Sequence, residues 1–233
     1  YLKAIIKKQS IIYMVLNTLK KNIKKLLDNN QDYLGINNQH QKDKTEEINM
    51  KIVFCIPGKK FSGTFLTCWT NLIKNLQINN IDWGMVNGYV PNISMSRQAL
   101  LDRARMHRPT HYMWIDDDQV FNTKHFDTLL NHDLDIVSGI YKKSNELFAC
   151  CKLDGKTLSI DDEIVDGVKE VTANGMGFML TKSHVFEFIH KPFDNLNDDQ
   201  WEDFGFASKA RQAGFKVNID GSVIVGHEKK MII

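Results

Sequence analysis

The sequence contains three consecutive carboxylates, Asp116-Asp117-Asp118, which could bind a metal ion. They directly follow the apolar run 112–115, and the next cation along the chain is Lys124. Adjacent acids repel one another, so this pattern favours a buried strand that delivers carboxylates to a divalent cation at the rim of a sheet. An acidic surface turn after a strand is the alternative.

A second motif, Gly58 to Gly63, has the G-x-x-x-x-G spacing of a phosphate-binding loop. Such a loop needs Lys and then Ser or Thr directly after its second glycine, because these groups contact the phosphates and Mg²⁺. Thr64 and Phe65 occupy those two positions here. The sequence therefore argues against a P-loop ATPase.

Composition and charge divide the chain into two parts. The 233 residues, 42% of them hydrophobic, suffice for one domain with a substantial core and an appendage. Residues 1–49 hold nine lysines against five acids, a charge of +4, whereas residues 50–233 hold 21 Lys and Arg against 23 acids, a charge of −2. The larger part lacks the basic field of a nucleic-acid-binding protein, so we expect no nucleic-acid partner. The four cysteines form no C-x-x-C pair, which predicts reduced thiols in a cytoplasmic protein.

The first 49 residues are expected to form two segments. Residues 1–29 place apolar side chains at helical spacing and contain seven lysines and one acid, which predicts a basic amphipathic helix. Residues 30–49 are polar and predict a linker. Such a helix can contact the anionic inner face of a membrane peripherally, and a helix without membrane contact is the alternative. Its longest apolar run, residues 11–16, is too short to span a bilayer.

Residues 50–233 alternate between apolar runs and helical spacings, as in an α/β domain. We expect strands at residues 52–56, 82–90, 112–115, 135–141, 148–153, 156–160, 168–173, 178–181, 217–219 and 222–225. We expect helices at residues 65–78, from a cap at Ser94 or Ser96 to 104, from a cap at Thr123 to 130, after Ser183, and at 201–213. This order predicts a mixed, mainly parallel sheet flanked by helices. Ligands of such sheets bind at the carboxyl ends of the strands, where the three acids lie.

Four motifs in residues 51–229 together resemble glycosyltransferases of the GT-A type, particularly family 2 and its small viral and bacterial members. The matching residues are the first strand Ile52 to Pro57, Arg97-Gln98 ahead of the next strands, the D-x-D motif Asp116-Asp117-Asp118, and Glu202-Asp203 with the later turn 211–217 and Gly226-His227. Two positions depart from the family: Gln98 replaces an Asn, and no acid stands where many relatives bind uracil. The resemblance therefore does not name the base.

The resemblance implies a Rossmann-like GT-A fold and a metal-dependent transfer of sugar from a nucleoside-diphosphate sugar to a glycan, lipid or protein acceptor. It implies Mn²⁺ or Mg²⁺ held by Asp116, Asp118 and His227, and the imidazole favours Mn²⁺. The donor would contact Pro57, Arg97, Asp116, Asp117 and Gly177. Asp203 would be the base of an inverting reaction, with Glu202 as the second candidate.

Two other functions fit parts of the same pattern. A nucleotidyltransferase of related topology would release pyrophosphate, and only Lys59 and Lys60 suggest its phosphate-binding loop. A catalytically silent relative would bind a nucleotide-sugar or a membrane without transfer. The sequence names neither donor sugar nor acceptor, and it indicates no oligomeric state.

Overall fold

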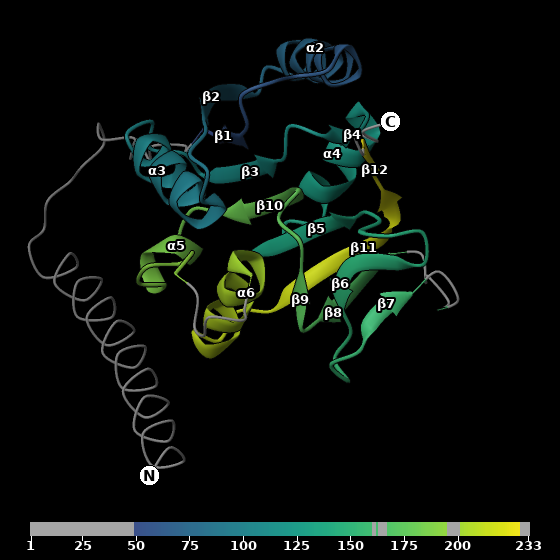
Figure 1. The fold of residues 1–233 in the computed structure, drawn as a ribbon. Helices are drawn as coiled ribbons and strands as arrows, with labels where there is room; N and C mark the ends of the chain where they lie inside the picture. The colour runs from purple at the N-terminus through teal and green to yellow at the C-terminus, as the bar shows by residue number, and fades with distance from the viewer. Residues whose placement is uncertain (1–48, 160–161, 163–166, 195–200, 229–233) are drawn as a thin grey trace, which may run out of the picture. The chain divides into compact units, whose positions relative to one another are not determined.

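A computed structural model describes residues 49–159, 162, 167–194 and 201–228 of the chain (Figure 1). The main sheet has seven strands: β1 (Lys51–Pro57), β2 (Asp82–Gly88), β3 (His111–Ile115), β5 (Ile136–Ile140), β8 (Val168–Val171), β10 (Phe178–Lys182) and β11 (Val217–Ile224). The short strands are β4 (Gln119–Val120), β6 (Leu147–Cys151), β7 (Thr157–Ser159), β9 (Ala173–Asn174) and β12 (Gly226–His227). The helices are α2 (Gly63–Ile78), α3 (Ile93–Arg105), α4 (Thr123–Asn131), α5 (Val185–Phe188) and α6 (Glu202–Gln212).

The main sheet is mixed and mainly parallel, as predicted. Its order is β2-β1-β3-β10-β5-β11-β8, in which β1, β2, β3, β5 and β11 run in one direction and β10 and β8 run in the other. Inserting β10 antiparallel between β3 and β5 brings the start of β10 to the sheet edge at which β3 ends. Residues before β10 therefore meet the acids after β3.

Both faces of the sheet are covered by helices, which explains why its central strands are apolar on both sides. Along β1, Ile52, Phe54 and Ile56 pack into a core with α2 and α4, whereas Val53 and Cys55 pack into a core with α3, α5 and α6. This alternation is that of a strand buried between two helical layers. All four cysteines are free thiols, and Cys55 and Cys150 are buried.

A three-stranded sheet, β7-β6-β9, lies beside the main sheet (Figure 1). Its β6–β7 hairpin turns at the predicted Asp154-Gly155, where Gly155 adopts a φ of 82° that favours glycine. The strand β9 pairs with β6 and leads directly into the turn 174–177 ahead of β10. The small sheet thus anchors one side of that turn.

Several predicted boundaries are wrong, because neighbouring amides supply the caps. Asn92, and not Ser94 or Ser96, caps α3 by accepting from the Met95 N–H (3.0 Å), and Ser96 instead exchanges hydrogen bonds with the backbone of Val90. Asn122, and not Thr123, caps α4 with His125 completing a capping box.

Other differences concern length. The helix expected after Ser183 has only four residues, Val185–Phe188, and its cap position is His184. The strands expected at 217–219 and 222–225 are one strand, β11, whose pairing with β5 shifts register between Ile219 and Ile224. The strand expected at 82–90 ends at Gly88.

The predictions for residues 1–49 lie almost entirely outside the described residues. Within the described part of the chain, no helix combines the length and the apolar character needed to cross a membrane.

Candidate active site

The acid triplet lies directly past the end of β3, a strand that is buried from Tyr112 to Ile115. The Asp116 N–H donates to the Gly177 carbonyl (3.0 Å), which extends the β3–β10 pairing by one residue. The Gln119 N–H then donates to the Asp116 carbonyl (3.2 Å) and closes a turn. All three acids are therefore held at the sheet edge, and each is partly buried.

Arg97 on α3 lies between two of the predicted site residues. Its Nη2 donates to Asp116 Oδ1 (2.9 Å), and its Nε donates to Glu202 Oε1 (3.1 Å). The Arg97 side chain is only 3% exposed. Although burial disfavours its charge, the carboxylates of Asp116 and Glu202 raise the pKa of Arg97, so the guanidinium stays charged.

His227 lies beside Asp118 because the two-residue strands β4 and β12 pair, with Gln119 opposite His227. Its Nε2 is 2.9 Å from Asp118 Oδ2, and its Nδ1–H donates to the Lys142 carbonyl (3.0 Å). A carbonyl only accepts, so this bond fixes the proton on Nδ1 and turns Nε2 toward Asp118. The hydrogen bond with Asp118 raises the pKa of His227.

The residues around Asp118 fit a divalent cation. Both ring nitrogens of His227 face acceptors, so without a metal a second proton on Nε2 binds the Asp118 carboxylate and raises the His227 pKa. A divalent cation could take the place of that proton between Nε2 and Oδ2. Adjacent ligands of an octahedral ion, with bonds of about 2.1 Å, lie roughly 3 Å apart, which matches the separation of Nε2 and Oδ2. Among the described residues, however, no three His, Cys, Asp or Glu side chains form a ready metal site. The third predicted ligand, Asp116, is oriented by Arg97, whose Nη2 lies 2.9 Å from its Oδ1 and 3.2 Å from its Oδ2.

Asp203 lies in the first turn of α6, next to Glu202. Its Oδ1 accepts from the Phe204 N–H (2.8 Å). Burial raises the pKa of Asp203 to about 6, and the neighbouring Glu202 carboxylate adds to the rise. A carboxylate with this pKa can accept a proton near neutral pH more readily than an exposed one.

Pro57 and Asp117 lie on the β1 side of the acids. Pro57 ends β1 and is buried. A Cβ on the following residue, Gly58, would come within 2.4 Å of the Asp117 side chain. Asp117 therefore lies against the loop after β1, and that loop requires a glycine at this point.

Two residues that the sequence did not single out, Tyr141 and Gln119, fill the space in front of Gly177. A Cβ on Gly177 would be 2.9 Å from Gln119 Nε2 and 2.9 Å from the Tyr141 ring. The backbone before β10 therefore passes close to the Tyr141 ring, which only glycine allows. Gln119 is fully buried, its Nε2 lies 3.5 Å from Asp118 Oδ1, and its Oε1 has no hydrogen-bond partner among the described residues.

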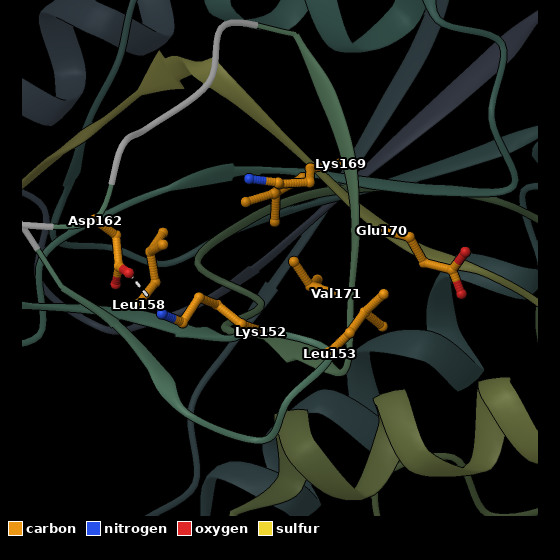
Figure 2. A pocket seen from close by; sticks show the side chains of 8 residues that line it. Lys152, Leu153, Leu158, Asp162, Lys169, Glu170 and Val171 are labelled. Atoms are coloured by element: carbon orange, nitrogen blue, oxygen red, sulfur yellow. Dashed lines mark hydrogen bonds and ion pairs between the residues drawn. The ribbon is translucent and has the colours of Figure 1, made fainter.

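A separate cavity of about 450 Å³ lies between the β6–β7 hairpin and the strands β8 and β11 (Figure 2). Its floor is apolar, and its rim includes the Lys152–Asp162 ion pair. It contains none of the predicted site residues. The candidate site is therefore the constellation around the acid triplet.

No family model matches the sequence, and a search of curated proteins found no match. Solved structures do match. GalNAc-T7 with UDP, GalNAc and Mn²⁺ has a TM-score of 0.53 at 9% identity, over 80% of this chain and 45% of that one. A197 from STIV has a TM-score of 0.49 at 20% identity, over 79% of this chain and 96% of that one. The catalytic domain of Drosophila β1,4-galactosyltransferase 7, in complex with xylobiose, has a TM-score of 0.49 at 14% identity, over 78% and 71%.

The fold is of the GT-A type. This fold assignment rests on the match to GalNAc-T7 and on the mainly parallel sheet between two helical layers. The chain spans less than half the length of that protein. The predicted fold class is therefore confirmed, whereas membership of family 2 is not.

Proposed function

We propose that this protein transfers a sugar from a nucleoside-diphosphate sugar to an acceptor hydroxyl, with inversion at the anomeric carbon. The observation that carries the proposal is the gathering of five carboxylates at the carboxyl edge of a GT-A sheet, where one buried guanidinium binds two of them. These acids are Asp116, Asp117, Asp118, Glu202 and Asp203.

A site with this charge repels a diphosphate unless a cation bridges them. Asp118 and His227, joined by Asp116, would hold Mn²⁺ or Mg²⁺. The chemistry that such an ion supplies when bound is Lewis-acid neutralisation of the leaving nucleoside diphosphate. In GalNAc-T7 the crystals contain UDP and Mn²⁺, which supports this choice of ligand class.

The chain's own residues take separate roles in the proposal. Asp203 accepts the proton of the attacking hydroxyl, because its raised pKa makes it the better base of the α6 pair. Glu202 is 5% exposed and bound to Arg97, so it fixes the start of α6 instead. Arg97 orients Asp116 through the same guanidinium, and its buried Nη1 has no partner within the described chain. Pro57, Asp117 and Gly177 shape the donor side.

The acceptor approaches from the start of α6. Trp201, directly before Asp203's turn, is 74% exposed and offers an aromatic face to a sugar. A glycan, or the glycan part of a lipid or protein, is the acceptor that this face suits. Peripheral membrane contact through residues 1–29 remains part of the proposal for a lipid-linked acceptor.

The proposal is tested by assaying nucleotide-sugars with and without Mn²⁺. We expect Mn²⁺-dependent release of a nucleoside diphosphate, lowered more than about 100-fold in Asp118→Ala, because even outer-shell changes cost 10- to 100-fold. The matched control is Asp82→Ala, an exposed acid at the opposite edge of the sheet, where β2 begins. Release of pyrophosphate would instead identify a nucleotidyltransferase, and Mn²⁺-dependent activity retained in Asp118→Ala would refute the assigned site.

A further inference from the structure

Tyr141 is the buried side chain around which the candidate site is assembled. It directly follows β5, and only 8% of it is exposed. A Cβ on Gly175 would lie 2.1 Å from its hydroxyl oxygen, and one on Gly177 would lie 2.9 Å from its ring. The turn ahead of β10 therefore packs directly against the Tyr141 side chain, and this close packing requires glycine at positions 175 and 177.

The hydroxyl of Tyr141 connects to the first acid of the triplet. The Gly177 N–H donates to Tyr141 Oη (3.2 Å), and the Gly177 carbonyl accepts from the Asp116 N–H (3.0 Å). Gly177 is buried, so its N–H would lack a ready partner if the phenol were removed. A displacement of Gly177 is passed on to Asp116 through a backbone hydrogen bond.

The ring of Tyr141 connects to the last residue of the site. It contacts the His227 imidazole edge to face, with ring centroids 5.4 Å apart and an interplanar angle of 67°. The next residue, Lys142, supplies the carbonyl that accepts from His227 Nδ1. Two consecutive residues after β5 thus fix both the tilt and the tautomer of the imidazole.

Tyr141 acts on the site through one hydrogen bond, from the Gly177 N–H, and through the ring contact with His227.

We propose that Tyr141 is a positioning residue that holds Asp116, through Gly177, and His227, through ring contact, in the arrangement that binds the metal. This inference rests on the proposed function, since the metal belongs to that function. The role requires no contact between Tyr141 and the substrate. It predicts that the hydroxyl and the ring can be separated by substitution.

The test compares Tyr141→Leu, which removes ring and hydroxyl, with Tyr141→Phe, which removes the hydroxyl alone. Tyr112→Phe is the matched control, because Tyr112 is a buried tyrosine of β3 that packs against Phe186. Mn²⁺ affinity is measured by water-proton relaxation. The exchange of the His227 Nδ1–H with water is measured by ¹⁵N NMR on metal-free protein.

We expect Tyr141→Leu to lower Mn²⁺ affinity at least about tenfold, as outer-shell changes do. In metal-free Tyr141→Leu the His227 Nδ1–H should also exchange with water faster, because the ring no longer holds the imidazole against the Lys142 carbonyl. Tyr141→Phe should keep the wild-type exchange rate and lose about fivefold in Mn²⁺ affinity, the equivalent of one hydrogen bond. Tyr112→Phe should change neither quantity.

A merely structural role would lower the melting temperature of Tyr141→Leu and leave its Mn²⁺ affinity and its His227 Nδ1–H exchange at wild-type values, which would overturn the inference. If Tyr141→Leu does not fold, unchanged Mn²⁺ affinity in Tyr141→Phe overturns it. If the wild-type protein binds no Mn²⁺, the proposed metal site fails, and the Nδ1–H exchange in metal-free Tyr141→Leu still decides whether Tyr141 positions His227.

Discussion

Arg97 is the one buried cation that the structure places among the described acids of the site. A guanidinium presents donors in a planar fork, so it can bind Asp116 through one nitrogen and Glu202 through another at the same time. Burying charges is favourable only when each is paired and hydrogen-bonded. Arg97 therefore serves stability and geometry together, because it sets where the first acid points.

Replacing Arg97 with methionine should lower the free energy of unfolding by about 3–5 kcal/mol, because Asp116 and Glu202 are left without a cation. Arg97→Lys should be more stable than Arg97→Met because it keeps a positive charge, yet it should lack transferase activity, since one ammonium cannot bind Asp116 and Glu202 in the same geometry. Urea unfolding measures both variants against Arg103→Met, an exposed arginine of the same helix. Equal stability of Arg97→Met and Arg103→Met would contradict the bridging role.

The raised pKa of Asp203 predicts that activity falls at acidic pH. Transfer requires its carboxylate, so kcat/KM should fall as the pH drops through about 6. Asp203→Asn should abolish transfer at every pH, whereas Asp194→Asn, an exposed acid, should keep both activity and profile. A wild-type profile that stays flat down to pH 4.5 would show that Asp203 is not the base.

The raised pKa of Asp203 also predicts that the ionised carboxylate, which activity requires, lowers the free energy of unfolding. The folded-state pKa of Asp203 lies above the value of about 4 for an unfolded aspartate, so the folded protein binds more protons between these pH values. The buried charge therefore destabilises the fold above pH 6, and this penalty vanishes below pH 4. Asp203→Asn should gain up to about 3 kcal/mol at pH 7 and nothing at pH 4, as thermal or urea unfolding at both pH values would reveal.

At the scale of elements, the turn 174–177 joins the small sheet to β10 and closes over Tyr141. Gly177→Ala forces a methyl group to within 2.9 Å of Gln119 and Tyr141, which should cost about 1–3 kcal/mol as overpacking does. It should also weaken Mn²⁺ binding, because Gly177 holds the Asp116 N–H. The control is Gly63→Ala at the start of α2, where a Cβ meets nothing within 4 Å. Wild-type stability and metal affinity in Gly177→Ala would refute the close packing.

Local patterns in the sequence predicted most elements, because apolar runs and helical spacings depend on near neighbours. They predicted β3 with its acids, the Asp154-Gly155 hairpin and the end of α6 before Gly214, which adopts a φ of 94°. Helix starts were less certain, because several Ser, Thr and Asn residues competed for each cap. Asn92 caps α3, because the Ser96 hydroxyl is hydrogen-bonded to the backbone of Val90.

The contacts that form the site depend on pairings across long stretches of chain. His227 reaches Asp118 only because β12 pairs with β4, and each of these strands has two residues and no pattern of its own. In the sequence, Tyr141 is indistinguishable from any other apolar residue at the end of a strand. Its role depends on the turn before β10, so the sequence signalled it only through the two glycines.

At the scale of the molecule, one edge of the sheet collects every residue of the candidate site. The parallel strands β1, β3 and β5 end there at Pro57, Ile115 and Ile140, and β10, which runs the other way, begins there after Gly177. β11 runs toward the same edge and continues into β12 with His227. The sheet topology thus brings residues that are far apart in the chain to one edge of the sheet (Figure 1).

That rim has an excess of negative charge, which predicts how binding changes the stability of the whole domain. A nucleoside diphosphate alone should raise the melting temperature little, since the acids repel its phosphates. With Mn²⁺, at ligand concentrations about 100 times Kd, binding should add about 2.7 kcal/mol and raise the melting temperature by roughly 5–10 °C. A thermal-shift screen of nucleoside diphosphates with Mn²⁺, Mg²⁺ or chelator measures this. Asp118→Ala should lose the metal-dependent rise and Asp82→Ala should keep it, whereas an equal rise in chelator would mean that the diphosphate binds away from the acid triplet.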